Sequence, residues 1–208
     1  MEEIRIPAAK TVVHLHDVAT MQWHMPDDVS VVASDGIFEA MILAQHRENF
    51  DLWHEEDEAR NPDASPARIA AVKHAIDRLN QRRNDLVESM DGSLASTFAQ
   101  NRDAPLHSET PGMMIDRLSI MALKIFHTRQ ETLRATATDA HRDKNLFRLS
   151  VLMEQRADLV GCLDKLVTDI RDGQRRFKIY RQMKMYNDPE LNPVLYRQAA
   201  RGDRGARS

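Results

Sequence analysis

Apolar residues recur at helical spacing over most of this chain, and this periodicity constrains the fold more than any other feature. In the segment 66–90, for example, Ile69, Val72, Ile76 and Leu79 fall on one side of a helix. No segment shows the strict apolar–polar alternation that is typical of a half-buried strand. We therefore predict an all-α protein, an antiparallel bundle of about five to six helices with a long central helix.

Residues typical of helix ends divide the chain into separate helices. Ser65 before Pro66 places an N-cap residue ahead of a proline in the first turn, and Thr110 before Pro111 repeats this arrangement. Gly173 is expected to end the fifth helix, because glycine readily adopts the conformation that terminates helices. The predicted helices cover residues 7–23, a segment from a cap at Ser34 or Asp35 to residue 60, 66–90, 111–135, 141–172 and 174–186.

The segments between these helices are rich in polar, small or helix-breaking residues. Residues 25–33 are predicted to form a loop, and residues 91–107 a polar connection with at most one helical turn. Residues 136–140 are a hinge of small residues. We predict one helical-bundle domain over residues 1–198 and a disordered Arg/Gly-rich tail over residues 199–208.

Four arginines, Arg60, Arg83, Arg129 and Arg156, fall on the apolar faces of predicted helices. An unpaired guanidinium in a dry core costs several kcal/mol, so four of them indicate an internal site for an anion. The guanidinium groups of Arg83, Arg129 and Arg156 are then expected to converge within about 10–12 Å, as bundle dimensions allow. The alternative is structural: buried arginines pair with carboxylates such as Glu56 and hold the helices in register.

The second predicted helix changes from apolar to polar along its length. Asn49, Trp53, Glu56 and Arg60 share one narrow face, with Asp57 at its edge. A carboxylate beside a bound anion is suited to general acid–base catalysis, and a histidine can carry the proton instead. The catalytic candidates are Glu56, Asp57 and His54. The ligand-binding candidates are Asn49, Trp53, Asn80, Arg83, Asn84, Thr110, Arg129, Arg156 and Lys184.

Arg129 and Arg156 are chosen by helical face alone, whereas Thr110 and Lys184 are chosen for their local chemistry. Thr110 caps a helix whose first N–H groups are free to bind an anion. Lys184 belongs to the basic segment 174–186, which is either a solvated helix or a lid that supplies cations to a phosphate.

Cys162 and His16 are of residue types that are often catalytic, but we expect both to have structural roles. Cys162 is the only cysteine and lies in a helical pattern, so we expect a small buried hydrophobic residue. His16 shares a face with Val12, Ala19 and Trp23, so we expect it to be packed and hydrogen-bonded.

Composition excludes some classes of function. The net charge of −3 gives no basic field for nucleic acid, and no apolar run is long enough for a transmembrane helix. A single cysteine and an N-terminus without an apolar signal core favour a cytoplasmic location. The expected partner is an anionic small molecule, and a homodimer is a further option.

A pair of acidic motifs leaves a metal-dependent alternative open. Glu55-x-x-Glu58 and Asp85-x-x-Glu88 loosely resemble the acidic motifs of all-α MazG-type nucleotide pyrophosphohydrolases. The resemblance implies Mg²⁺ held against a pyrophosphate, although such motifs are also common on solvated helix faces. We assign no metal ligands, and the cofactor stays unknown.

Several strings in combination resemble the bacterial family called domain of unknown function 4254, over residues 12–196. The strings are Leu15-His16-Asp17 with Trp23-His24, residues 49–57, residues 80–85, residues 108–120 and residues 184–189. The resemblance implies a link to cell-envelope glycan or sugar-nucleotide metabolism and establishes no activity. Its motif residues overlap those chosen above by helical face.

We therefore hold several hypotheses. The first is an enzyme that acts on a phosphorylated metabolite bound in an internal Arg/Glu/Asn pocket. The second is a non-catalytic ligand-binding or accessory protein that uses the same pocket. The others are the Mg-dependent pyrophosphohydrolase and a purely structural polar core in an oligomerising bundle.

Overall fold

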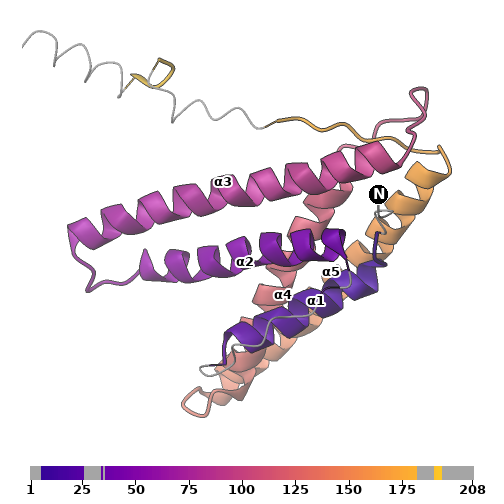
Figure 1. The fold of residues 1–208 in the computed structure, drawn as a ribbon. Coiled ribbons are helices and arrows are strands. Elements are labelled where there is room, and N and C mark those ends of the chain that lie inside the picture. The colour runs from indigo at the N-terminus through magenta and orange to yellow at the C-terminus, as the bar shows by residue number, and fades with distance from the viewer. Residues whose placement is uncertain (1–5, 26–33, 35, 182–189, 194–208) are drawn as a thin grey trace, which may run out of the picture.

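The computed structural model describes residues 6–25, 34, 36–181 and 190–193, and within them the chain forms five helices (Figure 1). The helices are α1 (Ala9–Trp23), α2 (Ile37–Glu58), α3 (Pro66–Thr97), α4 (Pro111–Leu133) and α5 (Asp139–Arg171). The prediction of an all-α fold is confirmed. None of these helices combines the length and the apolarity that a bilayer span requires.

The helices pack as two hairpins and one further helix. α4 and α5 form one antiparallel hairpin with α1 against it, and α2 and α3 form a second hairpin that crosses this unit at an angle (Figure 1). The hydrophobic core lies where all five helices meet, and it includes Val12 of α1, Ile42 of α2, Leu94 of α3, Leu118 of α4 and Ile170 of α5. The other end of the α2–α3 hairpin extends beyond this core (Figure 1).

Side-chain caps fix three of the helix starts. Ser65, Thr110 and Thr138 each accept a hydrogen bond from the backbone N–H three residues later. Gly173 ends α5 with a φ of 70°, a left-handed conformation that favours glycine. The predicted cap of α2 at Ser34 or Asp35 is wrong, because the N-cap position is Gly36, which has no side chain to offer.

The third helix is longer than predicted and ends at Thr97, not near Met90. The apolar stripe continues through the fully buried Leu94, and the hydroxyl of Ser93 bonds within the helix to the Ser89 carbonyl. Asp91, which looks like a surface residue in the sequence, is buried because it contacts the start of α4.

The predicted sixth helix is absent over residues 174–181, which run without helical structure. Phe177 is buried in the core, and its N–H donates to the Gln100 side chain at 2.7 Å. An isolated bridge between Leu106 and Arg176 ties this segment to the α3–α4 connection. The rest of the predicted sixth helix, the 26–33 loop and the 199–208 tail lie outside the described residues.

Cys162 is exposed, so the prediction of a buried cysteine is wrong. α5 buries a stripe that includes Leu159, Leu163 and Leu166, and Cys162 lies beside this stripe. The helical period was predicted correctly, but the width of the buried face was overestimated.

Candidate functional site

A cavity of about 340 Å³ lies between the outer half of α2, the middle of α3 and one face of α4. It is lined by Asn49, Leu52, Trp53, Glu56, Asp57, Arg60, Asn80, Arg83, Ile120 and Leu123. The structure thus brings together most of the site residues that were selected from helical faces of α2 and α3. The apolar side chains come from α2 and α4, and the polar ones from α2, from α3 and from Arg60 just beyond the end of α2.

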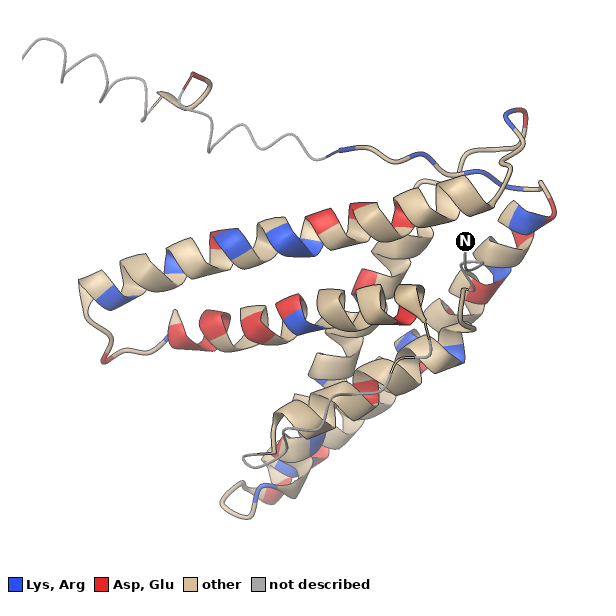
Figure 2. Ribbon diagram, viewed as in Figure 1, with Lys and Arg blue, Asp and Glu red and all other residues tan. Residues whose placement is uncertain are grey.

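The two helices of the hairpin carry opposite charges where they face each other. Acidic residues gather on the second half of α2 and basic residues on the first half of α3 (Figure 2). Arg82 pairs with Glu48 at 2.9 Å, and Arg68 pairs with Glu58 at 3.3 Å. These exposed pairs align the hairpin, and each contributes about 0–1 kcal/mol.

Arg83 is the arginine that lies both on the cavity wall and largely out of solvent. Its side chain is 23% exposed, and its Nη2 donates to Asn84 Oδ1 at 3.2 Å. Its Nε lies 3.9 Å from Asp116 Oδ1, which is beyond hydrogen-bonding distance. Arg83 Nε is buried and has no hydrogen-bond partner among the described residues. A buried donor in this state costs about 1–3 kcal/mol unless an acceptor reaches it.

Asp116 is held in place by two amides of α2. Gln45 Nε2 and Asn49 Nδ2 donate to Asp116 Oδ1 at 2.5 and 2.8 Å. Burial raises the pKa of the Asp116 carboxyl, while Arg83 and the Asn49 hydrogen bond act in the opposite direction. The oxygen nearest Arg83 is therefore already shared by two donors.

A buried chain of hydrogen bonds continues from Asn49 away from the cavity. Asn49 donates to Ser119 Oγ at 2.9 Å, Ser119 hydrogen-bonds to His46 Nδ1 at 2.7 Å, and His46 Nε2 hydrogen-bonds to Thr20 at 2.9 Å. Burial lowers the pKa of His46 to about 3, so its ring is neutral at pH 7. This chain joins α1, α2 and α4 behind the cavity.

Asn49 was selected from the sequence as a site residue, but the other members of the network were not, although a signal was present. Gln45, His46 and Asn49 interrupt the apolar face of α2. Ser119 and Asp116 interrupt the same region of α4, which is otherwise almost wholly apolar. Polar residues on two facing apolar stripes indicate a buried network.

His16 is fully buried next to this network, as predicted from its helical face. Its ring centroid lies 4.5 Å from that of His46. Neither ring nitrogen of His16 has a hydrogen-bond partner in the described part of the chain, so the predicted hydrogen bond is not found. Burial lowers the pKa of His16 well below its usual value.

Trp53 forms the aromatic part of the cavity wall. Its ring stacks on His127 with centroids 4.6 Å apart and an interplanar angle of 1°. His54, a candidate proton carrier, does not line the cavity; its Nδ1 bonds to the Phe50 carbonyl at 2.8 Å. Of the catalytic candidates, Glu56 and Asp57 line the cavity, and Glu56 pairs with Arg60 at 2.9 Å.

The expected convergence of three arginines is wrong. Arg156 Nη1 donates to both carboxylate oxygens of Asp17, at 2.8 and 2.9 Å, and so joins α5 to α1. Arg129 is exposed and lines a separate depression that includes Asp17. Helical faces alone do not reveal that these two arginines lie on the α1 side of α4, away from Arg83.

The start of α4 already holds a carboxylate of the chain itself. Thr110 Oγ1 donates to Asp91 Oδ2, and the Gly112 N–H donates to Asp91 Oδ1 at 2.7 Å. Burial raises the pKa of Asp91 to about 6. Thr110 is therefore a buried cap whose helix start is occupied, and Lys184, the remaining ligand-binding candidate, lies outside the described residues.

One residue of each acidic motif that suggested a metal is bound to another side chain. Glu58 pairs with Arg68, and Asp85 accepts a hydrogen bond from Gln81 at 2.7 Å. Among the residues that the structure describes, no group of three or more His, Cys, Asp or Glu side chains is arranged to hold a metal ion.

The fold and the cavity together define an all-helical protein with an arginine on the wall of a polar cavity between a hairpin and a central helix. The chain belongs to the family described as Protein of unknown function (DUF4254), which matches residues 39–179. The resemblance found in the sequence is thereby confirmed, and the matched region includes every residue that lines the cavity. No curated protein and no solved structure matches the chain.

Proposed function

We propose that the cavity between α2, α3 and α4 binds an anionic small molecule, with Arg83 as the main contact of its phosphate or carboxylate group. The observation that carries this proposal is the buried Arg83 Nε, which lies at the cavity wall without a hydrogen-bond partner in the described residues. An oxyanion supplies both the acceptor and the opposite charge.

The rest of the lining suits the body of such a ligand. Leu52, Ile120 and Leu123 provide apolar surface, and Trp53 adds an aromatic ring. Asn80 donates through its amide nitrogen to the Ile76 carbonyl at 3.0 Å, which holds the side chain at the cavity wall. A volume of about 340 Å³ lies in the range of small-molecule sites, about 300–1,000 Å³.

The same contacts serve an enzyme or a non-catalytic binding protein. In the enzyme, Glu56 or Asp57 at the cavity wall transfers a proton to or from the bound molecule. Loss of turnover with retained binding in the Glu56→Gln variant would support the enzyme, with Glu56 as its catalytic carboxylate. The family resemblance adds cell-envelope glycan and sugar-nucleotide metabolism as the area in which to search for a substrate.

The test compares Arg83→Gln with the neighbouring Arg82→Gln, using inorganic phosphate, pyrophosphate, citrate and sugar phosphates in thermal-shift and calorimetric titrations. An anion at a hundred times its Kd stabilises the folded chain by about 2.7 kcal/mol. We expect Arg83→Gln to weaken binding of that anion about tenfold or more, because it removes a charged hydrogen bond. Arg82 pairs with Glu48 on the surface, so its variant controls for the loss of one charge.

Circular dichroism and urea unfolding establish that both variants are folded before affinities are compared. The proposal fails if no anion stabilises the wild-type chain. It also fails if Arg82→Gln and Arg83→Gln weaken binding equally, since the anion then responds only to overall charge.

A further inference from the structure

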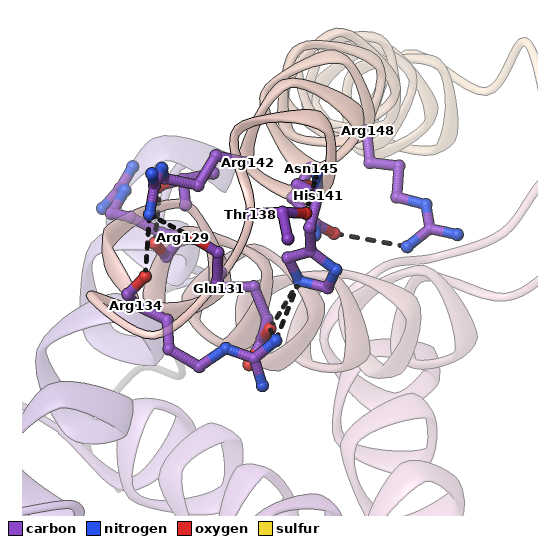
Figure 3. Close-up of polar contacts among 10 residues, drawn as sticks. Arg129, Glu131, Arg134, Thr138, His141, Arg142, Asn145 and Arg148 are labelled. Atoms are coloured by element: carbon purple, nitrogen blue, oxygen red, sulfur yellow. Dashed lines mark hydrogen bonds and ion pairs between the residues drawn. The ribbon is translucent and has the colours of Figure 1, made fainter.

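A second cavity, of about 530 Å³, adjoins the first at Trp53, which lines both. It lies between the second half of α4 and the first half of α5, beside the turn that joins them. Figure 3 shows this end of the hairpin, where Arg134 and His141 hold Glu131, and Arg148 bonds to Asn145. Glu131, Asn145 and Arg148 line the second cavity, and each is held by one of these contacts.

Aromatic and aliphatic side chains form much of this cavity. The stacked rings of Trp53 and His127 make one wall, and Phe147 and Leu152 of α5 make another. Phe147 is 71% exposed, an unusual state for a phenylalanine at the rim of a cavity. Apolar surface of this kind is stabilised by covering it, and a flat ring covers it well.

The same cavity also carries polar groups that an alkyl chain leaves unsatisfied. His127 Nε2 is buried and lacks a hydrogen-bond partner within the described residues. Burial lowers the pKa of His127 to about 4, so its neutral ring both donates and accepts at pH 7. Thr128 and Gln155 add further polar atoms, and Lys124 and Arg148 add positive charge.

We propose that the two adjoining cavities bind one nucleotide, with its nitrogen heterocycle in the α4–α5 cavity and its phosphate at Arg83. This inference rests on the proposed function, which supplies the phosphate contact. A heterocycle combines a flat apolar face for Phe147 and the aromatic wall with ring nitrogens and carbonyls for His127. Trp53 lies at the junction of the two parts.

The test measures Kd by calorimetry for ADP, GDP, CDP and UDP, for the four matching nucleosides, for inorganic pyrophosphate and for dodecyl phosphate. At least one nucleoside diphosphate is expected to bind about tenfold more tightly than pyrophosphate and than its own nucleoside, because both cavities are then filled. Phe147→Ala is expected to weaken that nucleotide about five- to tenfold, as loss of base–aromatic stacking does, and to leave pyrophosphate binding unchanged. Leu146→Ala is the control, since Leu146 is an exposed neighbour outside the cavity lining.

The outcomes separate this inference from the proposed function. If pyrophosphate binding depends on Arg83 but no nucleoside diphosphate binds more tightly than pyrophosphate, the nucleotide proposal is refuted and the anion-site proposal is retained. Tighter binding of dodecyl phosphate than of every nucleotide also overturns it, since the second cavity then prefers a chain to a ring. Equal effects of Phe147→Ala and Leu146→Ala count against the placement of the heterocycle.

Discussion

A carboxylate of α3 supports the start of α4, and the Gly112→Ala substitution tests how closely the two elements fit. A Cβ at position 112 would lie 2.8 Å from Asp91 Oδ1 and 2.9 Å from its Cγ. These distances are far shorter than a normal contact. Asp91 is 2% exposed, so its carboxylate has no solvent-facing position to move into.

The cost follows from the bonds that the displaced carboxylate gives up. Asp91 accepts one hydrogen bond from the Gly112 N–H and one from the Thr110 hydroxyl. Hydrogen bonds to charged groups contribute about 1.5–3 kcal/mol each, so losing both costs about 3–6 kcal/mol. The better helix propensity of alanine returns about 1 kcal/mol. We expect Gly112→Ala to lower the free energy of unfolding by about 2–5 kcal/mol.

Urea unfolding followed by circular dichroism measures this change, and Gly161→Ala is the matched control. Gly161 lies within α5, and a Cβ there meets nothing within 4 Å. That variant should gain about 0.5–1 kcal/mol from helix propensity alone. The reasoning is refuted if Gly112→Ala is neutral or stabilising like Gly161→Ala, since the carboxylate would then be free to move.

Two further predictions concern the buried network and the arginines. The folded-state pKa of His46, about 3, lies below the usual 6.5, so its contribution to stability is complete above pH 6.5 and is lost as the pH falls. Between pH 6.5 and 5 the loss in the free energy of unfolding amounts to about 2 kcal/mol. Measured by urea unfolding, the free energy of unfolding of His46→Gln should therefore fall less steeply with decreasing pH than that of the wild type. An equally steep fall contradicts the prediction. Arg156→Gln should lower stability by about 1 kcal/mol or less by breaking its partly exposed pair with Asp17, and leave the Kd of every anion unchanged. A weaker Kd in that variant would place Arg156 in the site.

The sequence predicted the starts of α3 and α4 correctly because the causes of these two starts are local. Ser65-Pro66 and Thr110-Pro111 each contain the cap and the first turn within a few residues. The end of α3 could not be predicted in this way, since Asp91 is satisfied by residues about twenty positions later. Residues 174–181 were misjudged for a related reason: tertiary burial of Phe177 outweighs the helical periodicity of the segment.

The candidate site was predicted in part because of how its elements are connected. A short loop joins α2 and α3, so the two helices lie antiparallel side by side, and residues of both, among them Glu56 and Arg83, line one cavity. No such connection relates α5 to α3, and periodicity does not give the spatial order of helices. Arg156 was therefore assigned to the wrong neighbours, and its partner Asp17 was not foreseen.

Arg156 and Arg83 each lie beside a carboxylate of another helix, and the contrast between these two pairs bears on function. Arg156 donates to both oxygens of Asp17 at 2.8 and 2.9 Å, as a structural ion pair does. Arg83 stops 3.9 Å from Asp116, whose nearest oxygen already accepts bonds from Gln45 and Asn49. A pair that only held helices together would close, because an open buried pair retains the cost of desolvation without the gain of a hydrogen bond. Asp116, held by the network behind it, thus leaves Arg83 Nε at the cavity wall without a hydrogen-bond partner in the described residues, and this open donor is the basis of the proposed anion site.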